Sequence, residues 1–150
     1  MAPATLTESK AGTLQSVNPY NGELLKTYRE MTHGEVDAAI ATADGAYRAW
    51  RETSYEHRAR ILRRAAELFR ERREELARLM TLEMGKKIGD ARPEIDLCAT
   101  IFDYYADEGE KILAPKEYNT KEGKGTLINQ PLGIVYGIQP WTFPFYLSLI

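Results

Sequence analysis

The chain has 150 residues, of which 43% are hydrophobic and 28% are charged, the composition of an ordinary globular domain. Its formal net charge of -2 at pH 7 does not favour a nucleic acid or an anionic membrane as partner. The single cysteine, Cys98, excludes an internal disulfide, and neither His33 nor His57 has metal-ligand spacing with it. We therefore expect a small molecule or another protein as the ligand, and no metal site.

The N-terminal residues are expected to form a disordered tail over 1–13, followed by a folded unit over 14–150. The opening MAPATLTESKAG lacks the apolar stretch of a secretory signal. No stretch reaches the roughly 18 consecutive apolar residues typical of a membrane span. These features predict a cytoplasmic protein.

A short hairpin and a first helix are predicted next. The turn formers Asn18-Pro19 and Asn21-Gly22 lie between two segments that can extend, which is typical of a β-hairpin. Thr32 and Glu35 have the spacing of a capping box, in which each side chain accepts from a free amide of the first helical turn. Apolar residues then recur at helical spacing at Val36, Ala39, Ile40, Ala43, Tyr47 and Trp50.

A second, long helix is predicted from Ser54 to a C-terminal cap at Gly85. Between Glu56 and Arg78 it carries eight arginines and five glutamates. This run could be a nucleic-acid stripe, but the two signs are interleaved at spacings of three and four residues. We therefore interpret it as a solvated helix surface.

A third helix is predicted from about Asp90 to Leu113, because Pro93 is tolerated in a first turn. Cys98 lies on the apolar stripe of this helix together with Ile95 and Phe102. A nucleophilic cysteine needs surroundings that favour the thiolate, and this stripe offers none. We interpret Cys98 as a small buried apolar residue.

The last part of the sequence changes character. Gly123–Gly125 predicts a turn, and Thr126–Gln130 an extended segment. Ile134–Ile138 is apolar without alternation, which favours a strand of a parallel sheet, covered on both faces; a helix is expected to begin at Phe145. Because no second such strand is present, we expect this sequence to be the opening of a larger α/β domain.

Two motifs near the end carry a family resemblance. PLGIV at residues 131–135 and IQPWTFP at 138–144 resemble the signature of NAD(P)-dependent aldehyde dehydrogenases. The NPYNGE turn and the stretch RARILRRAAELFRERREELARLMTLEMGKKI resemble the same family, particularly its succinate-semialdehyde dehydrogenase branch. The resemblance covers residues 16–150. It implies an incomplete α/β unit: the N-terminal helical part and first strand, over 133–139, of a Rossmann-type cofactor-binding domain.

The resemblance also implies a chemistry in which a cysteine thiolate attacks the aldehyde, hydride passes to NAD or NADP, and a glutamate-activated water hydrolyses the thioester. It assigns four residues to the cofactor: Ile138, Gln139, Pro140 and Trp141. Phe143 matches a position that lines the aldehyde tunnel. Thr142 matches an oxyanion position where family members usually have asparagine, and its shorter, branched side chain carries its donor at a different point.

Two hypotheses of different class follow. In the first, the chain is the N-terminal portion of an aldehyde dehydrogenase that oxidises a small, succinate-semialdehyde-like aldehyde, and is inactive alone because the catalytic cysteine and glutamate are absent. In the second, it is a non-catalytic interaction module, since the resemblance implies that an extended segment over about 116–130 belongs to the family's oligomerisation region. The resemblance implies a homo-oligomer, and neither hypothesis includes a nucleic acid or a membrane. A free-standing helical ligand-binding domain would leave the terminal strand unexplained.

Overall fold

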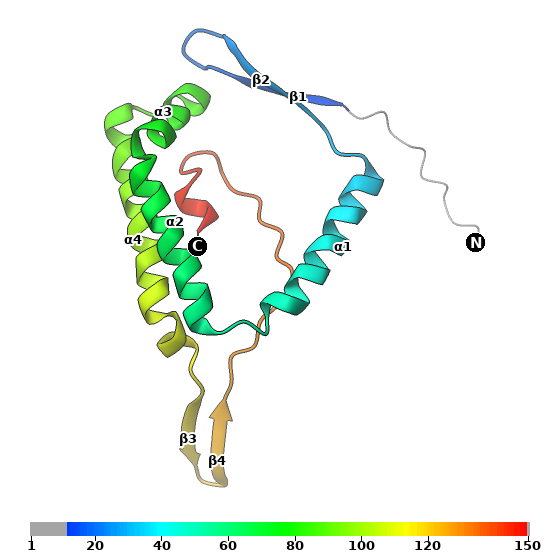
Figure 1. The fold of residues 1–150 in the computed structure, drawn as a ribbon, viewed down its shortest axis with the longest axis vertical. Helices are drawn as coiled ribbons and strands as arrows, with labels where there is room; N and C mark the ends of the chain where they lie inside the picture. The colour runs from blue at the N-terminus through cyan, green and yellow to red at the C-terminus, as the bar shows by residue number, and fades with distance from the viewer. Residues whose placement is uncertain (1–11, 150) are drawn as a thin grey trace, which may run out of the picture.

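The computed structural model describes residues 12–149. In chain order its elements are β1 (Thr13–Val17), β2 (Leu24–Arg29), α1 (His33–Trp50), α2 (Tyr55–Glu71), α3 (Arg73–Met84), α4 (Ile88–Leu113), β3 (Lys116–Thr120), β4 (Gly123–Leu127) and the 3-10 turn η1 (Tyr146–Ser148) (Figure 1). The predicted tail over 1–13 lies mostly outside the described residues. Its last residue, Thr13, instead begins β1, paired with Arg29 of β2.

The predicted first hairpin is confirmed. β1 and β2 are antiparallel, with a bulge between Ser16 and Val17. The turn closes where the amide of Gly22 donates to the carbonyl oxygen of Asn18 at 2.8 Å. Gly22 has φ 74, a left-handed conformation that glycine adopts without a steric penalty.

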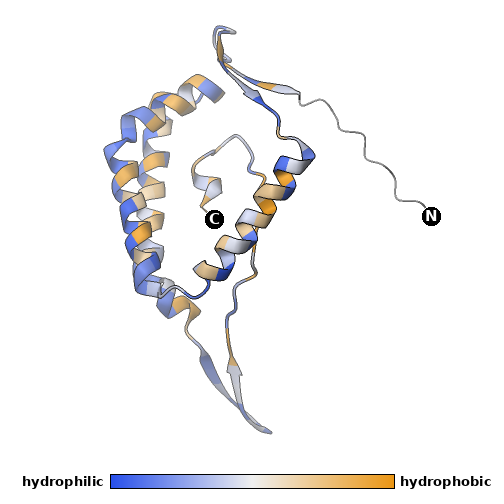
Figure 2. Cartoon of the chain, turned by 45° about the vertical axis from the view of Figure 1, so that its right-hand side comes forward, coloured by the Kyte–Doolittle hydropathy of each residue, from blue (hydrophilic) through white to orange (hydrophobic). Residues whose placement is uncertain are grey.

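The first helix begins at the predicted capping box. Thr32 Oγ1 accepts from the amide of Glu35 at 3.3 Å, and Glu35 Oε2 accepts from the amide of Thr32 at 2.8 Å. No residue of α1 is buried, however, and Ile40 is 55% exposed. α1 stands apart from α2, α3 and α4, and its apolar residues show as an orange face (Figures 1 and 2). The stripe is present but has no covering element in the described chain.

The prediction of one long helix from Ser54 to Gly85 was wrong. The region is two helices, α2 and α3, separated at Arg72, which leaves helical geometry at φ -99 and ψ 16. The predicted caps at both outer ends are confirmed: Ser54 Oγ accepts from the amide of His57, and Gly85 is left-handed with φ 76. The break lets both helices lie against α4, so tertiary packing overrides the local helix preference.

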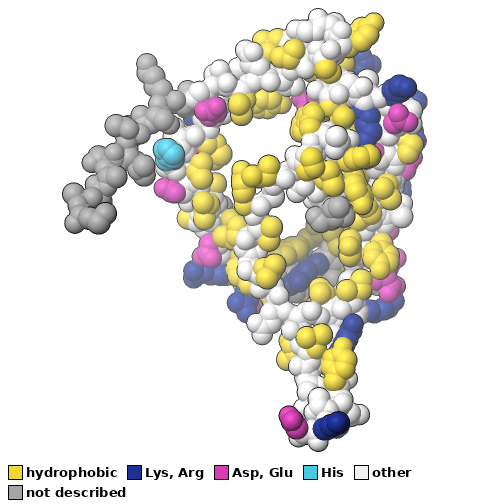
Figure 3. Space-filling model, turned by 180° about the vertical axis from the view of Figure 1, so that it is seen from behind, with side chains coloured by type: hydrophobic (Ala, Val, Ile, Leu, Met, Phe, Trp, Pro, Cys, Tyr) yellow, Lys and Arg dark blue, Asp and Glu magenta, His cyan; other side chains and the backbone are white. Residues whose placement is uncertain are grey.

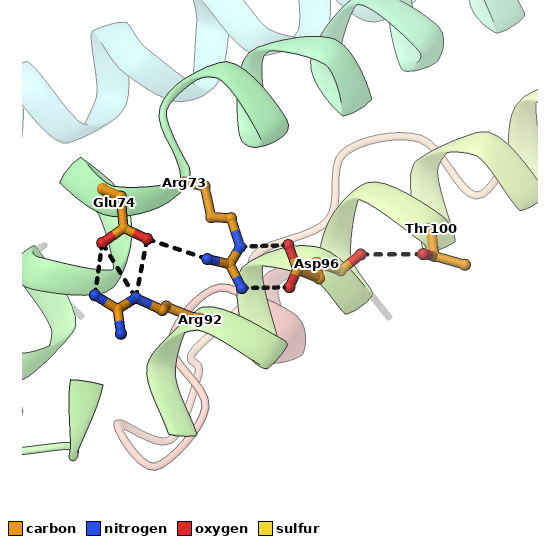
Figure 4. Close-up of polar contacts among 5 residues, drawn as sticks. All are labelled: Arg73, Glu74, Arg92, Asp96 and Thr100. Carbon is orange, nitrogen blue, oxygen red and sulfur yellow. Dashed lines mark hydrogen bonds and ion pairs between the residues drawn. The ribbon is translucent and has the colours of Figure 1, made fainter. Parts of the chain in front are cut away.

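Ion pairs fix α3 against α4 just after this break. Arg73 donates two hydrogen bonds to Asp96, at 2.7 and 2.8 Å, and Arg92 donates to both carboxylate oxygens of Glu74 (Figure 4). The arginine run of α2 is paired in the same way along its outer surface, for example Arg64 with Glu67 at 2.8 Å. The run is therefore a neutralised helix surface, as interpreted from the interleaved charges.

The core lies where α2 and α3 pack on α4. Its buried residues are mostly small: Ala59, Ala66, Ala77, Met80, Ala91, Ile95, Cys98 and Ala99. Small side chains let helix axes approach closely, and the partly buried Phe69 and Phe145 pack against this core. The third predicted helix is confirmed as α4, with Pro93 near its start. None of the helices in residues 12–149 combines the length and the hydropathy that a membrane span requires.

The region after α4 differs from expectation in three respects. β3 and β4 form an antiparallel hairpin that projects from the molecule (Figure 1), and its turn is Lys121–Glu122, so the expected turn at Gly123–Gly125 is instead the start of β4. The expected strand over 133–139 is not formed, since residues 128–140 belong to no helix or strand. A parallel strand needs hydrogen-bonded neighbours, and the described chain supplies none for this segment. In place of the helix expected at Phe145 there is only η1.

Candidate functional site

The residues singled out for function lie on the segment that runs back between α1 and the other helices (Figure 1). Ile138 is 80% exposed, and Gln139 and Pro140 are also exposed. Trp141 lines a cleft of about 450 Å³ together with β1 residues and Glu83 of α3. Glu83 also accepts a hydrogen bond from Ser16 of β1 at 2.9 Å, so this cleft has one fixed wall.

Thr142 and Phe143 lie next to Lys86, which comes just after α3. The Lys86 ammonium donates to the carbonyl oxygen of Thr142 at 3.2 Å. It also lies 3.9 Å from the centre of the Phe143 ring, a favourable contact between a cation and an aromatic face. Thr142 is an exposed residue, and its backbone carbonyl is held by the hydrogen bond from Lys86.

A buried carboxylate completes the hold on this segment. Glu94 of α4 forms an ion pair with Lys86 through Oε2. Its other oxygen, Oε1, accepts from the backbone amides of Phe145 and Tyr146, both at 3.2 Å. The ring of Phe145 packs edge-to-face on Phe69 of α2, with ring centres 5.8 Å apart. Segment 142–146 is thus attached to α2, to α4 and to the connection between α3 and α4.

Lys86 and Glu94 were not predicted from the sequence. Glu94 did leave a signal, because it falls on the same helical face as Ala91, Ile95 and Cys98. A single charge within an apolar stripe indicates a buried, paired group. Lys86 left no such signal in the sequence, since a lysine just after a helix cap is common on protein surfaces.

Cys98 is fully buried, as predicted. Burial, together with the nearby negative charge of Glu94, raises the pKa of its thiol to about 12. At neutral pH the side chain is therefore a thiol and not a nucleophilic thiolate. Among the described residues, no group of three or more His, Cys, Asp or Glu side chains is arranged to hold a metal ion.

Apolar side chains gather along the inner side of the molecule in the space-filling view (Figure 3). Some of these side chains line an open cleft of about 600 Å³, which is formed mainly by α1 residues together with Gly133 and Ile134. Residues 138–141 are all exposed and belong to no helix or strand. Such an exposed segment fits one face of a flat ligand, with other residues required to enclose it.

A sequence model of the aldehyde dehydrogenase family matches residues 6–150. The chain belongs to the aldehyde dehydrogenase family. A succinate-semialdehyde dehydrogenase [NADP(+)] of Deinococcus radiodurans is 45% identical over 131 residues, which cover 87% of this chain and 28% of that protein. A Mycobacterium tuberculosis relative of the same description is 38% identical over 136 residues, covering 89% of this chain and 30% of the relative.

Aldehyde dehydrogenase structures have the same fold over the matched part. The NADP+ complex of succinic semialdehyde dehydrogenase from Streptococcus pyogenes superposes with a TM-score of 0.85 at 34% identity, covering 90% of this chain and 30% of that one. The chain is therefore a partial α/β unit of an aldehyde dehydrogenase fold, and it spans about 30% of the length of these relatives.

Proposed function

We propose that this chain is the N-terminal portion of an enzyme that oxidises a small aldehyde of the succinate-semialdehyde type to its acid, through a cysteine thioester formed elsewhere in the longer protein. The observation that supports the proposal is the 45% identity to the Deinococcus radiodurans enzyme over 131 residues. NADP is the cofactor favoured by the descriptions of the most similar relatives.

Thr142 is proposed to stabilise the negative charge that develops on the aldehyde oxygen. Its exposed hydroxyl can donate one hydrogen bond, and its backbone is held by Lys86 at 3.2 Å. Such donors typically lower a barrier by about 3–4 kcal/mol when they are well aimed. The Phe143 ring, next to it, is proposed to line the approach of the aldehyde.

Ile138, Gln139, Pro140 and Trp141 are proposed to contact one side of the cofactor. When bound, the nicotinamide would accept a hydride from the aldehyde carbon. These residues would bind and orient the cofactor, and their exposed apolar side chains would exclude water from one face of it. Their exposed backbone carbonyl groups supply polar contacts.

The 150 residues alone are proposed to be inactive. Their only cysteine is buried, with its pKa raised to about 12, so it cannot attack an aldehyde. We expect no NADPH from the isolated chain with succinate semialdehyde.

The proposal is tested by replacing the matching segment of the Deinococcus radiodurans enzyme with this chain and following NADPH absorbance. We expect an active chimera, and Thr142→Asn in it should raise kcat by roughly tenfold or more, since an asparagine amide reaches further toward the oxyanion. Thr27→Asn, at an exposed position in β2, is the matched control and should leave kcat unchanged. Well-folded chimeras that form no NADPH with either residue at position 142 would contradict the proposal.

The alternative function, an interaction module, is supported by the projecting β3–β4 hairpin. Its Tyr118 and Leu127 are about half exposed, and a two-stranded hairpin leaves both strand edges open. The segment over about 116–130 would then join the sheet of another subunit. Size-exclusion chromatography with light scattering tests this: the isolated chain should co-elute with the intact relative, and Tyr118→Lys should abolish co-elution.

A further inference from the structure

One buried ion pair lies directly under the segment that carries the proposed oxyanion residue. The side chain of Glu94 is 2% exposed and that of Lys86 is 11% exposed. A buried charge is costly unless it is paired and its remaining hydrogen-bonding capacity is used. Here that capacity is used by segment 142–146 and not by the helices.

The pair contacts this segment on both sides of Pro144. Before the proline, Lys86 donates to the carbonyl oxygen of Thr142. After it, one oxygen of Glu94 accepts from the amides of Phe145 and Tyr146. Hydrogen bonds to an ionised group are short-ranged and directional, so these contacts define the position of the backbone, which packing of the Phe145 ring alone would not do.

We propose that Lys86 and Glu94 are positioning residues, which fix the backbone of residues 142–146 and thereby the place at which the Thr142 hydroxyl meets the substrate. The role of Thr142 in this statement rests on the proposed function, whereas the fixing of the backbone does not. The residues just before this segment have no comparable hold, since Val135 is 74% exposed and Ile138 is 80% exposed. The pair thus lies at the boundary between the exposed residues 135–138 and the held residues 142–146.

The test is residue-resolved amide hydrogen exchange of the 150-residue chain by NMR. The amides of Phe145 and Tyr146 are compared with reference amides in α2. Glu94→Gln should speed exchange at these two amides at least about fivefold relative to the references, because a charged acceptor is replaced by a neutral one. Their proton resonances should also move upfield.

Variants of the lysine and a matched control sharpen the test. Lys86→Met should act in the same direction, and Lys86→Arg, which keeps the charge and the donors, should restore exchange to within about twofold. Asp96→Asn lies on the same helix and also breaks an ion pair, with Arg73, but does not touch segment 142–146. It should leave the exchange ratio unchanged.

Two results would overturn the proposal. One is that the Phe145 and Tyr146 amides are unprotected in the unsubstituted chain. The other is that the Glu94 and Lys86 variants speed exchange in α2 by the same factor, since the pair would then stabilise the whole unit and position nothing. Neither readout involves an aldehyde or a cofactor. If protection is lost as expected but Thr142→Asn does not change kcat in the chimera, the oxyanion role fails and the positioning role stands.

Discussion

The start of α1 concentrates several interactions on one carboxylate. Glu35 accepts from the amide and the hydroxyl of Thr32, and Arg29 donates to both of its oxygens, at 2.5 and 2.9 Å. The hydrogen bond from Arg29 lowers the pKa of Glu35 from 4.5 to about 2, with the Thr32 contacts as the next cause. Because α1 buries none of its residues, its stability depends on the interactions of its first turn more than the stability of α2 or α4 does.

The pH dependence follows from the sign of this shift. Because the folded chain holds Glu35 ionised to lower pH than the unfolded chain, its stabilising effect is complete above about 4.5 and is lost as the pH falls toward about 2. An NMR titration of the Glu35 carboxyl should give a midpoint near 2, and Arg29→Gln should move it toward 4.5. Arg48→Gln, on the same helix but paired with Asp44, should leave the midpoint in place.

Helix ends were predicted from the sequence better than helix continuity. Thr32, Ser54 and Gly85 were recognised as caps because a cap depends on its own side chain or on the absence of one. The break at Arg72 was missed because no proline or glycine marks it and its cause is the contact with α4. Local chemistry can be read from a sequence, whereas a bend imposed by a partner element cannot.

Gly85 should be the glycine that is most costly to replace. Its φ of 76 disfavours a side chain, and an added Cβ would lie 3.2 Å from Pro19 of the first hairpin. We expect Gly85→Ala to lower the free energy of unfolding by about 1–2 kcal/mol. Gly45→Ala, within α1 and with nothing within 4 Å of the added Cβ, should raise it by about 0.5–1 kcal/mol. Urea denaturation of both variants checks the prediction; a loss at Gly45 as large as at Gly85 would contradict it.

At the scale of the whole molecule, burial is uneven. α2, α3 and α4 form a packed unit, while α1 and residues 128–140 keep their apolar side chains open to solvent. The apolar run over 134–138 was recognised from the sequence as buried-strand material, but a strand requires partners that a pattern does not supply. The same holds for the proposed site, where Thr142 and Phe143 were predicted from the motif. Glu94 left only a charge within an apolar stripe and Lys86 left no signal, because their contacts with this segment join residues distant in sequence.

Substitutions at two isoleucines, one buried and one exposed, test this difference in burial. Ile95 is fully buried in the core, so Ile95→Thr should lower the free energy of unfolding by about 2 kcal/mol or more. Ile138 is 80% exposed, and Ile138→Thr should change it by no more than about 0.5 kcal/mol. Thermal and urea unfolding followed by circular dichroism compare the two. Equal losses would mean that residues 128–140 are packed in solution.

The small residues between α2, α3 and α4 have a consequence for tolerance to mutation. Where a core is filled by large side chains, truncating a side chain is the damaging change. Here the helices meet through small residues, so enlarging a side chain is the damaging change; these residues are Ala66, Ala77, Ala91 and Ala99. In a library covering every substitution, the steepest loss of folded protein should therefore fall at alanines, and Ala→Gly should often survive where Ala→Val does not. The close spacing between these helices would then limit sequence divergence more than the number of large apolar side chains does.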